Sequence, residues 1–248
     1  MRKILEAVFS KRTYLLAARA DVVDIMARCW KSSAGTNCTN KLNLQEFHNM
    51  KEEFLKIYTE NITRPGADKF LKWLENSDFF IAPASTQFHL SKPEGLVTHS
   101  LNVYKRLKML CEAEAAYSQN GFEQPSDESI AICGLLHDIC KVNFYTVEMR
   151  NRKNEFGQWE QVPFYKVKDK LPYGHGEKSV YIISSYMKLS RDESFAVRWH
   201  MGFGDASATG NNAYSVSNAF NQFPLATLTH IADMQATYLD EREIEDDN

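Results

Sequence analysis

Apolar residues recur three and four positions apart along most of this chain. That spacing places them on one face of a helix, as in residues 3–30, where one or two amphipathic helices are predicted. The same spacing predicts further helices at residues 43–60, 67–76, 95–116, 127–141, 175–189, 192–201 and 223–240. Residues 31–42 are rich in Ser, Thr, Asn and Lys and predict a loop. The pattern indicates an all-α protein.

One segment lacks the helical spacing. Residues 142–147 and 161–167 are rich in β-branched and aromatic side chains, and a polar stretch that contains Gly157 separates them. Two such runs around a turn predict a β-hairpin, inserted between helices at about residues 142–168. We expect three parts along the chain: an N-terminal helical extension (1–75), a helical core that includes the hairpin (76–242) and an acidic tail (243–248).

The composition is that of an ordinary globular protein. Of the 248 residues, 44% are hydrophobic and 25% are charged, which is enough apolar material for a large core. The net charge of −3 argues against a protein whose main task is to hold duplex nucleic acid, because such proteins need a basic surface. A nucleotide substrate remains compatible, since bound metal ions can supply positive charge. No run of about 18 apolar residues occurs, so neither a membrane span nor a membrane partner is expected.

The cysteines give no sign of a disulfide framework. There are five, an odd number, and no two of them form a C-x-x-C pair of the kind that binds zinc. They are Cys29, Cys38, Cys111, Cys133 and Cys140. This usage favours a reducing, cytoplasmic location.

The adjacent pair His137 and Asp138 is the strongest candidate for chemistry. It follows the apolar run 132–136, and an imidazole beside a carboxylate at the end of a buried helix is costly unless both are satisfied. Metal binding satisfies them, and the carboxylate can serve two ions if it bridges them. Lys141 lies four residues beyond His137, so it is predicted on the same helix face, where a cation can hold a phosphate oxygen.

Further histidines and one aspartate lie on the other predicted helices. His99 and His175 lie near the starts of two helices, His200 lies at the end of a third, and Asp233 lies in the last. Nitrogen and oxygen ligands of this kind suit Mn, Fe, Ni, Co or Zn.

The order His, His-Asp, His, His, Asp resembles the binuclear branch of the HD superfamily. Residues 95–100 (GLVTHS) are similar to that family's GGLxxHS opening, 137–141 (HDICK) to its HDxxK motif, and 230–233 (HIAD) to its HxAD ending. Residues 82–89 (APASTQFH) resemble a segment found before the opening motif in some bacterial members. The resemblance covers roughly residues 76–240 and implies a helical bundle that acts as a metal-dependent phosphohydrolase.

The sequence departs from that family in four places. Cys140 stands where many relatives have glycine, which we expect to be a packing change, and Glu94 replaces the first glycine of the opening motif. No GYP motif accompanies the site, which disfavours a cyclic-di-GMP phosphodiesterase of the HD-GYP type. No OB-fold module of the kind that HD exoribonucleases carry is predicted before the core.

The resemblance implies two divalent transition-metal ions. The first would be held by His99, His137, Asp138 and Asp233, and the second by Asp138, His175 and His200. A hydroxide that bridges the ions would attack the phosphoester of a nucleotide or other small phosphate ester, with Asp138 and Lys141 as the catalytic residues.

Three more residues have candidate roles with alternatives. His230 is either a second-layer group that holds Asp233 or a helix-packing residue. His89 either binds the substrate or stabilises a loop through a hydrogen bond. Tyr173 either binds the substrate or packs against neighbouring aromatic side chains. The alternatives for the whole protein are a di-iron oxygenase, resembling myo-inositol oxygenase or phosphonate-cleaving oxygenases, and a non-catalytic nucleotide sensor.

Overall fold

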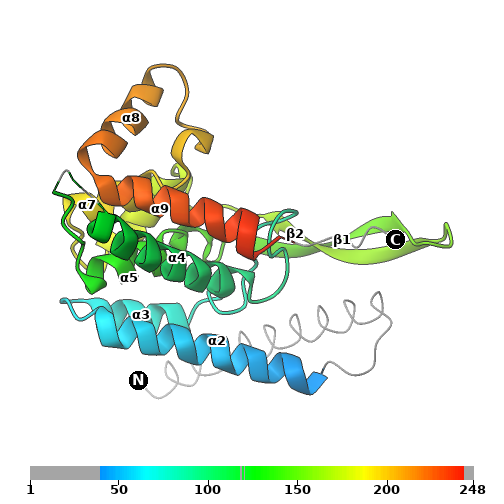
Figure 1. The fold of residues 1–248 in the computed structure, drawn as a ribbon. Helices are drawn as coiled ribbons and strands as arrows, with labels where there is room; N and C mark the ends of the chain where they lie inside the picture. The colour runs from blue at the N-terminus through cyan, green and yellow to red at the C-terminus, as the bar shows by residue number, and fades with distance from the viewer. Residues whose placement is uncertain (1–39, 118, 120, 243–248) are drawn as a thin grey trace, which may run out of the picture. The chain divides into compact units, whose positions relative to one another are not determined.

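The computed structural model describes residues 40–117, 119 and 121–242 (Figure 1). The helices predicted in residues 3–30, most of the predicted loop at 31–42 and the acidic tail lie outside the described residues. The chain divides into two compact units, residues 46–146 with 166–248 and residues 1–45 with 147–165. The first unit holds almost all the described helices, and the second holds most of the hairpin.

The described part of the chain is mostly helical, which confirms the predicted fold class. The α-helices are α2 (Asn40–Asn61), α3 (Ala67–Glu75), α4 (Gly95–Tyr117), α5 (Asp127–Leu136), α6 (His175–Ser184), α7 (Arg191–Arg198), α8 (Ala213–Gln222) and α9 (Pro224–Gln235). Three short 3-10 helices are η1 (Ile139–Lys141), η2 (Gly202–Gly204) and η3 (Gly210–Asn212), and a π-helix, η4 (Ala236–Asp240), follows α9.

Helix α8 is the one described α-helix that the apolar spacing did not predict. Its sequence is AYSVSNAFNQ, and only Val216 and Ala219 are buried. Two buried positions are too few to produce a recognisable apolar stripe.

Helix α4 lies at the centre of the first unit. It packs against α5 and α9, while α7 packs against α6 and α9 (Figure 1). The core formed between these helices also includes residues of α2 and α3, among them Phe54, Phe70 and Leu74, all fully buried. Burying a side chain of this size stabilises the folded state by about 1.5–3 kcal/mol. Residues between 50 and 74 therefore share the core with these helices, and a separate N-terminal extension over residues 1–75 stays a prediction.

Two glycines allow the close helix contacts on which the site depends. A Cβ atom at Gly134 of α5 would lie 2.5 Å from the Cα atom of Tyr104 of α4. A Cβ atom at Gly176 of α6 would overlap the backbone carbonyl of Arg198, at the end of α7. Only a residue without a side chain fits so close to a neighbouring backbone. These contacts bring α4 to α5 and α6 to α7, the two helix pairs that carry or directly precede five of the six candidate metal ligands.

Local capping and an internal ion pair fix where α7 begins. The Ser190 side chain accepts a hydrogen bond from the Glu193 backbone, and the Glu193 carboxylate accepts one from the Ser190 backbone. This reciprocal pair is a capping box. Arg64 donates to both oxygens of the buried Glu193, at 2.7 Å each, so the carboxylate is also neutralised.

The predicted hairpin is present. Strands β1 (Tyr145–Lys153) and β2 (Trp159–Val167) form a two-stranded sheet. At the turn between them Gly157 has φ of 75°, a conformation that glycine adopts without strain, and its N–H donates to the carbonyl of Asn154. Strand β2 contains the predicted run 161–167, whereas β1 begins at Tyr145 and shares only its first three residues with the predicted run 142–147.

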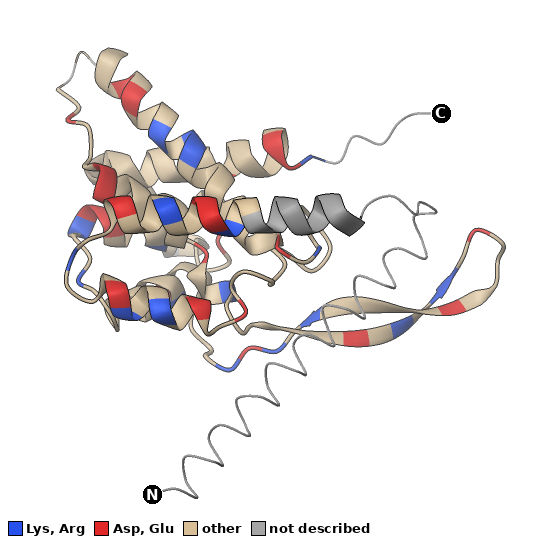
Figure 2. Ribbon diagram, turned by 90° about the horizontal axis from the view of Figure 1, so that it is seen from below, with Lys and Arg blue, Asp and Glu red and all other residues tan. Residues whose placement is uncertain are grey.

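Charged residues of both signs are mixed along the chain. Figure 2 shows Lys and Arg interspersed with Asp and Glu along the described helices and strands.

None of the helices in residues 40–242 that the structure describes has both the length and the hydropathy needed to cross a membrane.

Candidate metal centre

The structure brings the six candidate ligands together from five segments of the chain. His99 lies in α4, His137 and Asp138 follow α5, and His175 is the first residue of α6. His200 follows α7, and Asp233 lies in α9. His99, His137, Asp138 and His200 are at most 3% exposed. The side chains of Asp233 and His175 are 13% and 31% exposed, respectively, so the cluster is open on one side.

Helix α5 ends earlier than the apolar spacing predicted. It stops at Leu136, and the predicted helix at 127–141 continues as the 3-10 helix η1. The reason is local, because Asp138 has φ of −101° and ψ of 20°, outside the α-helical region. The turn directs Asp138 into the cluster.

The carboxylate of Asp138 lies between two pairs of imidazoles. Its Oδ2 atom is 3.6 Å from Nε2 of His99 and 3.6 Å from Nε2 of His137. Its Oδ1 atom is 2.8 Å from Nε2 of His175 and 3.4 Å from Nε2 of His200. The two oxygens therefore face different pairs of nitrogen atoms, as a carboxylate that bridges two cations does. Asp233 lies on the first side, where its Oδ1 is 3.2 Å from Nε2 of His99.

Hydrogen bonds on the outer ring nitrogens fix the tautomers of two of these histidines. Nδ1 of His137 donates to the carbonyl of Gly134 at 2.9 Å, and Nδ1 of His200 donates to the carbonyl of Val197 at 2.7 Å. A carbonyl accepts only, so the proton is on Nδ1 and the Nε2 lone pair of each ring points into the cluster.

The inner nitrogens approach one another closely. Nε2 of His137 is 3.2 Å from Nε2 of His99, and Nε2 of His175 is 3.2 Å from Nε2 of His200. Lone pairs that converge at such distances repel unless a cation or a proton lies between them. Four groups of His, Asp and Glu in this region have ligand atoms within 4.8 Å of one another, and Asp138 belongs to two of them. The donor set fits two metal ions that share Asp138.

The electrostatics favour positive charge in both halves of the cluster. Burial opposes a charge on His99, but hydrogen bonds to Asp233 and Glu241 raise its pKa to about 10. Burial likewise opposes a charge on His175, but Cys140 and Asp138 raise its pKa to about 10. Burial lowers the pKa of His137 to about 3, so that ring is neutral. A neutral imidazole is the form that binds a metal.

Lys141 lies beside the cluster and lines the adjoining cavity. Its Nζ atom is 2.6 Å from Oδ2 of Asp138, and that contact contributes to a pKa for Lys141 above its ordinary value despite burial. The helical spacing predicted Lys141 on the face of His137, but the chain turns into η1 and Lys141 pairs with Asp138 instead.

A cavity of about 930 Å³ opens onto the cluster. Its polar end includes His99, Asp138, His175 and Asp233. Its other walls include several large apolar side chains that are partly or largely exposed, namely Phe88, Met201, Phe203, Met234 and Tyr238. Tyr145 and Val167, the first residue of β1 and the last of β2, also line it.

His89 lines this cavity, and its role in substrate binding stays a prediction. Its Nε2 atom is buried and has no hydrogen-bond partner among the described residues. Burial lowers the pKa of His89, so its ring is neutral near pH 7.

The other two subsidiary candidates, Tyr173 and His230, make contacts with the protein itself. Tyr173 stacks on Tyr181, with ring centroids 5.1 Å apart, and is not among the residues that line the cavity. His230 lines the cavity, but its Nδ1 donates to the backbone carbonyl of His200 at 2.7 Å. It therefore supports the segment that carries His200, and its assignment to Asp233 stays a prediction.

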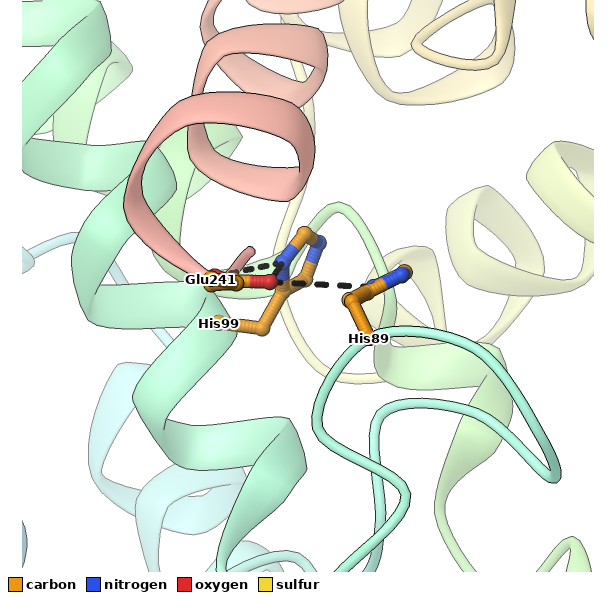
Figure 3. A group of neighbouring side chains, drawn as sticks. All are labelled: His89, His99 and Glu241. Atoms are coloured by element: carbon orange, nitrogen blue, oxygen red, sulfur yellow. Dashed lines mark hydrogen bonds and ion pairs between the residues drawn. The ribbon is translucent and has the colours of Figure 1, made fainter. Parts of the chain in front are cut away.

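Two neighbours of the ligands were not identified from the sequence. Glu241, 7% exposed, lies 3.0 and 3.1 Å from Nδ1 of His99 through its two carboxylate oxygens (Figure 3). In the sequence Glu241 lies within a run of charged residues, and such a run predicts a solvent-exposed C-terminal segment. Cys140 departs from the family pattern and was expected to be a packing change, but its Sγ atom lies 3.3 Å from Nδ1 of His175.

The chain was compared with protein families, curated proteins and solved structures. A family model described as the HD domain matches residues 96–244, which is more than half of the chain and includes all six candidate ligands. No curated protein and no solved structure matched the chain.

Proposed function

The chain belongs to the HD domain family, and on that basis we propose that it hydrolyses a phosphoester bond of a nucleotide or other small phosphate ester. The family is one of metal-dependent phosphohydrolases. The observation that carries the proposal is the position of Asp138, whose two oxygens face different pairs of imidazoles at the base of a cavity.

Each half of the cluster would hold one ion. His99, His137, Asp233 and Oδ2 of Asp138 surround the first position. His175, His200 and Oδ1 of Asp138 surround the second. When bound, two divalent ions such as Mn, Fe, Ni, Co or Zn lower the pKa of a water molecule and withdraw charge from phosphoryl oxygens.

The protein's own groups orient the phosphate. Lys141 reaches the cavity next to Asp138, where its ammonium group can hold a phosphoryl oxygen that approaches the cluster. His89 offers an unsatisfied ring nitrogen in the same cavity. The backbone bonds of His137 and His200 keep their rings fixed while the substrate binds, so the ligand geometry does not have to be reorganised during the reaction.

Replacing Lys141 by alanine is expected to lower kcat/KM by roughly ten- to a thousand-fold, the usual effect of losing a charge-assisted contact in the transition state. Metal affinity should not weaken, because a protonated lysine is not a ligand and its removal relieves repulsion between like charges. Steady-state kinetics and metal titration of the same preparations test both points. A K141A variant that loses metal would show that Lys141 supports the ligands rather than the substrate.

The apolar walls of the cavity indicate what is esterified to the phosphate. The volume of about 930 Å³ is far larger than a phosphate group needs and lies at the upper end of the range for small-molecule sites. Phe88, Phe203 and Tyr238 present exposed aromatic rings around it. A substrate with a flat or apolar group attached to the phosphate, such as a nucleoside, fits these walls better than an inorganic polyphosphate does.

Replacing Phe203 by alanine is therefore expected to raise KM for an aromatic phosphate ester roughly tenfold, the change that corresponds to losing ~1.4 kcal/mol of ring contact. The matched control is Phe156→Ala, since Phe156 is also highly exposed (81%) but does not line the cavity. The KM of each variant is measured with nitrophenyl phosphate, which has an aromatic ring, and with a small alkyl phosphate, which has none. Only KM for the aromatic ester should rise in F203A. Equal effects of both substitutions on KM would contradict an aromatic-binding wall.

The proposed function is tested by a substrate screen on protein purified without added metal and then loaded with each candidate ion. The screen compares phosphate monoesters, phosphate diesters and nucleotides, with release of alcohol or phosphate as the readout. Hydrolysis that disappears with chelator and returns with metal is the expected result. Protein that contains two metal ions and hydrolyses none of these classes would contradict the proposal.

A further inference from the structure

Glu241 is a buried carboxylate next to the cluster that the two-metal arrangement does not use. Both of its oxygens lie within hydrogen-bond distance of Nδ1 of His99, and one of them also accepts from the side-chain amide of Asn102 at 2.9 Å. A carboxylate can only accept, so Nδ1 of His99 is the donor. In the neutral ring, the form that binds a metal, the lone pair of His99 is then on Nε2, which faces Asp138, His137 and Asp233.

The π-helix η4 explains how Glu241 reaches this position. Glu241 comes eight residues after Asp233, and in a continuous α-helix it would lie ~80° around the axis from it. The backbone N–H of Glu241 instead donates to the carbonyl of Ala236, five residues earlier, at 3.0 Å. A π-helix has more residues per turn, so each residue rotates less and Glu241 returns toward the face of Asp233. Figure 3 shows the resulting approach of Glu241 to His99.

We propose that Glu241 is a positioning residue of the metal centre, which holds His99 with its Nδ1 protonated and its Nε2 aimed at the first metal position. The inference rests on the proposed function, because it takes His99 to be a ligand. The carboxylate prevents the ring from rotating or adopting the other tautomer, and its negative charge makes Nε2 a stronger donor to a cation.

A third ion at this place is the competing explanation. His89, His99 and Glu241 have ligand atoms within 4.8 Å of one another, and Nε2 of His89 is 3.8 Å from Oε2 of Glu241. Such an ion would have to bind Nδ1 of His99 while the first ion binds Nε2. A neutral imidazole has only one free lone pair, so His99 would have to lose its remaining proton. The hydrogen bond from His99 to Glu241 requires no such change.

The test compares zinc binding by the full-length wild type and by the variants Glu241→Ala, Glu241→Gln and Asp240→Asn, using titration against a competing chelator. Asp240 is the matched control, because it is the adjacent carboxylate and pairs with Arg106 on the surface. E241A is expected to weaken binding of one zinc equivalent by about ten- to a hundred-fold. E241Q should weaken it less, because the amide oxygen still accepts from Nδ1, and D240N should bind both ions as the wild type does.

Proton NMR of the zinc-loaded protein supplies a signature that a purely structural role would not change. The Nδ1–H resonance of His99 should lie far downfield in the wild type and D240N, and move upfield or disappear in E241A. Wild-type affinity and an unmoved resonance in E241A would overturn this inference alone. Loss of a third zinc equivalent in both His89→Ala and E241A would overturn it in favour of a third ion. A wild type that binds no metal would overturn the proposed function, and this inference with it.

Discussion

Replacing Asp138 by alanine is expected to abolish the binding of both metal ions and all turnover above background. Asp138 is the one side chain whose oxygens face both pairs of imidazoles, at 3.6 Å on one side and 2.8 and 3.4 Å on the other. Its removal takes a ligand and a negative charge from both positions at once, and leaves the second position with only the neutral imidazoles of His175 and His200. Metal content after dialysis and hydrolysis of the best substrate measure the two effects.

A contrasting variant makes this prediction specific. His200 is assigned to the second position, beside Oδ1 of Asp138, so His200→Ala should lose one metal equivalent and retain the other. Asp240→Asn removes a surface carboxylate and should keep both. Equal metal content in the wild type and in H200A would show that the second position is assigned wrongly. Retention of both ions by D138A would contradict a shared bridging ligand.

Turnover is expected to continue without dioxygen and with redox-inert metals. In a hydrolase the ions act as Lewis acids and change no oxidation state, so zinc- or manganese-loaded protein should hydrolyse its substrate at a comparable rate under nitrogen. A di-iron oxygenase with the same ligands would require iron and would consume dioxygen in proportion to product. Oxygen and iron dependence gives the largest difference between the hydrolase and the oxygenase, because a hydrolase would be fully active under nitrogen with zinc and an oxygenase would be inactive.

The experiment measures one preparation with and without oxygen, and repeats the pair after exchange of the metal. Oxygen consumption is recorded in parallel, and D138A serves as the control for chemistry that does not depend on the site. Strict dependence on dioxygen and iron would overturn the phosphohydrolase proposal even if all six ligands were confirmed. A nucleotide sensor would give a third result: nucleotide binding that needs the metal, with no turnover in either atmosphere.

Local sequence patterns predicted much of the fold and named the six candidate ligands that the structure brings together. The apolar spacing placed α4 and α9 within a few residues of their observed starts, because each buries an apolar stripe against its neighbours. The β-branched runs at 142–147 and 161–167 marked the strands of the hairpin. The motifs around His99 and Asp233 matched a family whose model covers residues 96–244.

Other features could not be read from local patterns. The end of α5 at Leu136 depends on a backbone turn at Asp138 that the apolar run before it does not encode. Glu241 reaches His99 only because η4 adds a residue to one helical turn, and its charged neighbours hide it in the sequence. Helix α8 buries too few side chains to show a periodicity.

The sequence by itself determined the chemistry available, that is, which imidazoles and carboxylates lie near helix ends and which family pattern they follow. Only the tertiary structure decided how these groups are used. Contacts between α4 and α5 and between α6 and α7 place two imidazoles on each oxygen of Asp138, and Gly134 and Gly176 permit the close approach. The physical reason is the distance along the chain over which each effect acts. Helix spacing relates residues only a few positions apart, whereas ligand atoms that lie within 4.8 Å of one another come from segments that can be more than a hundred residues apart in the sequence.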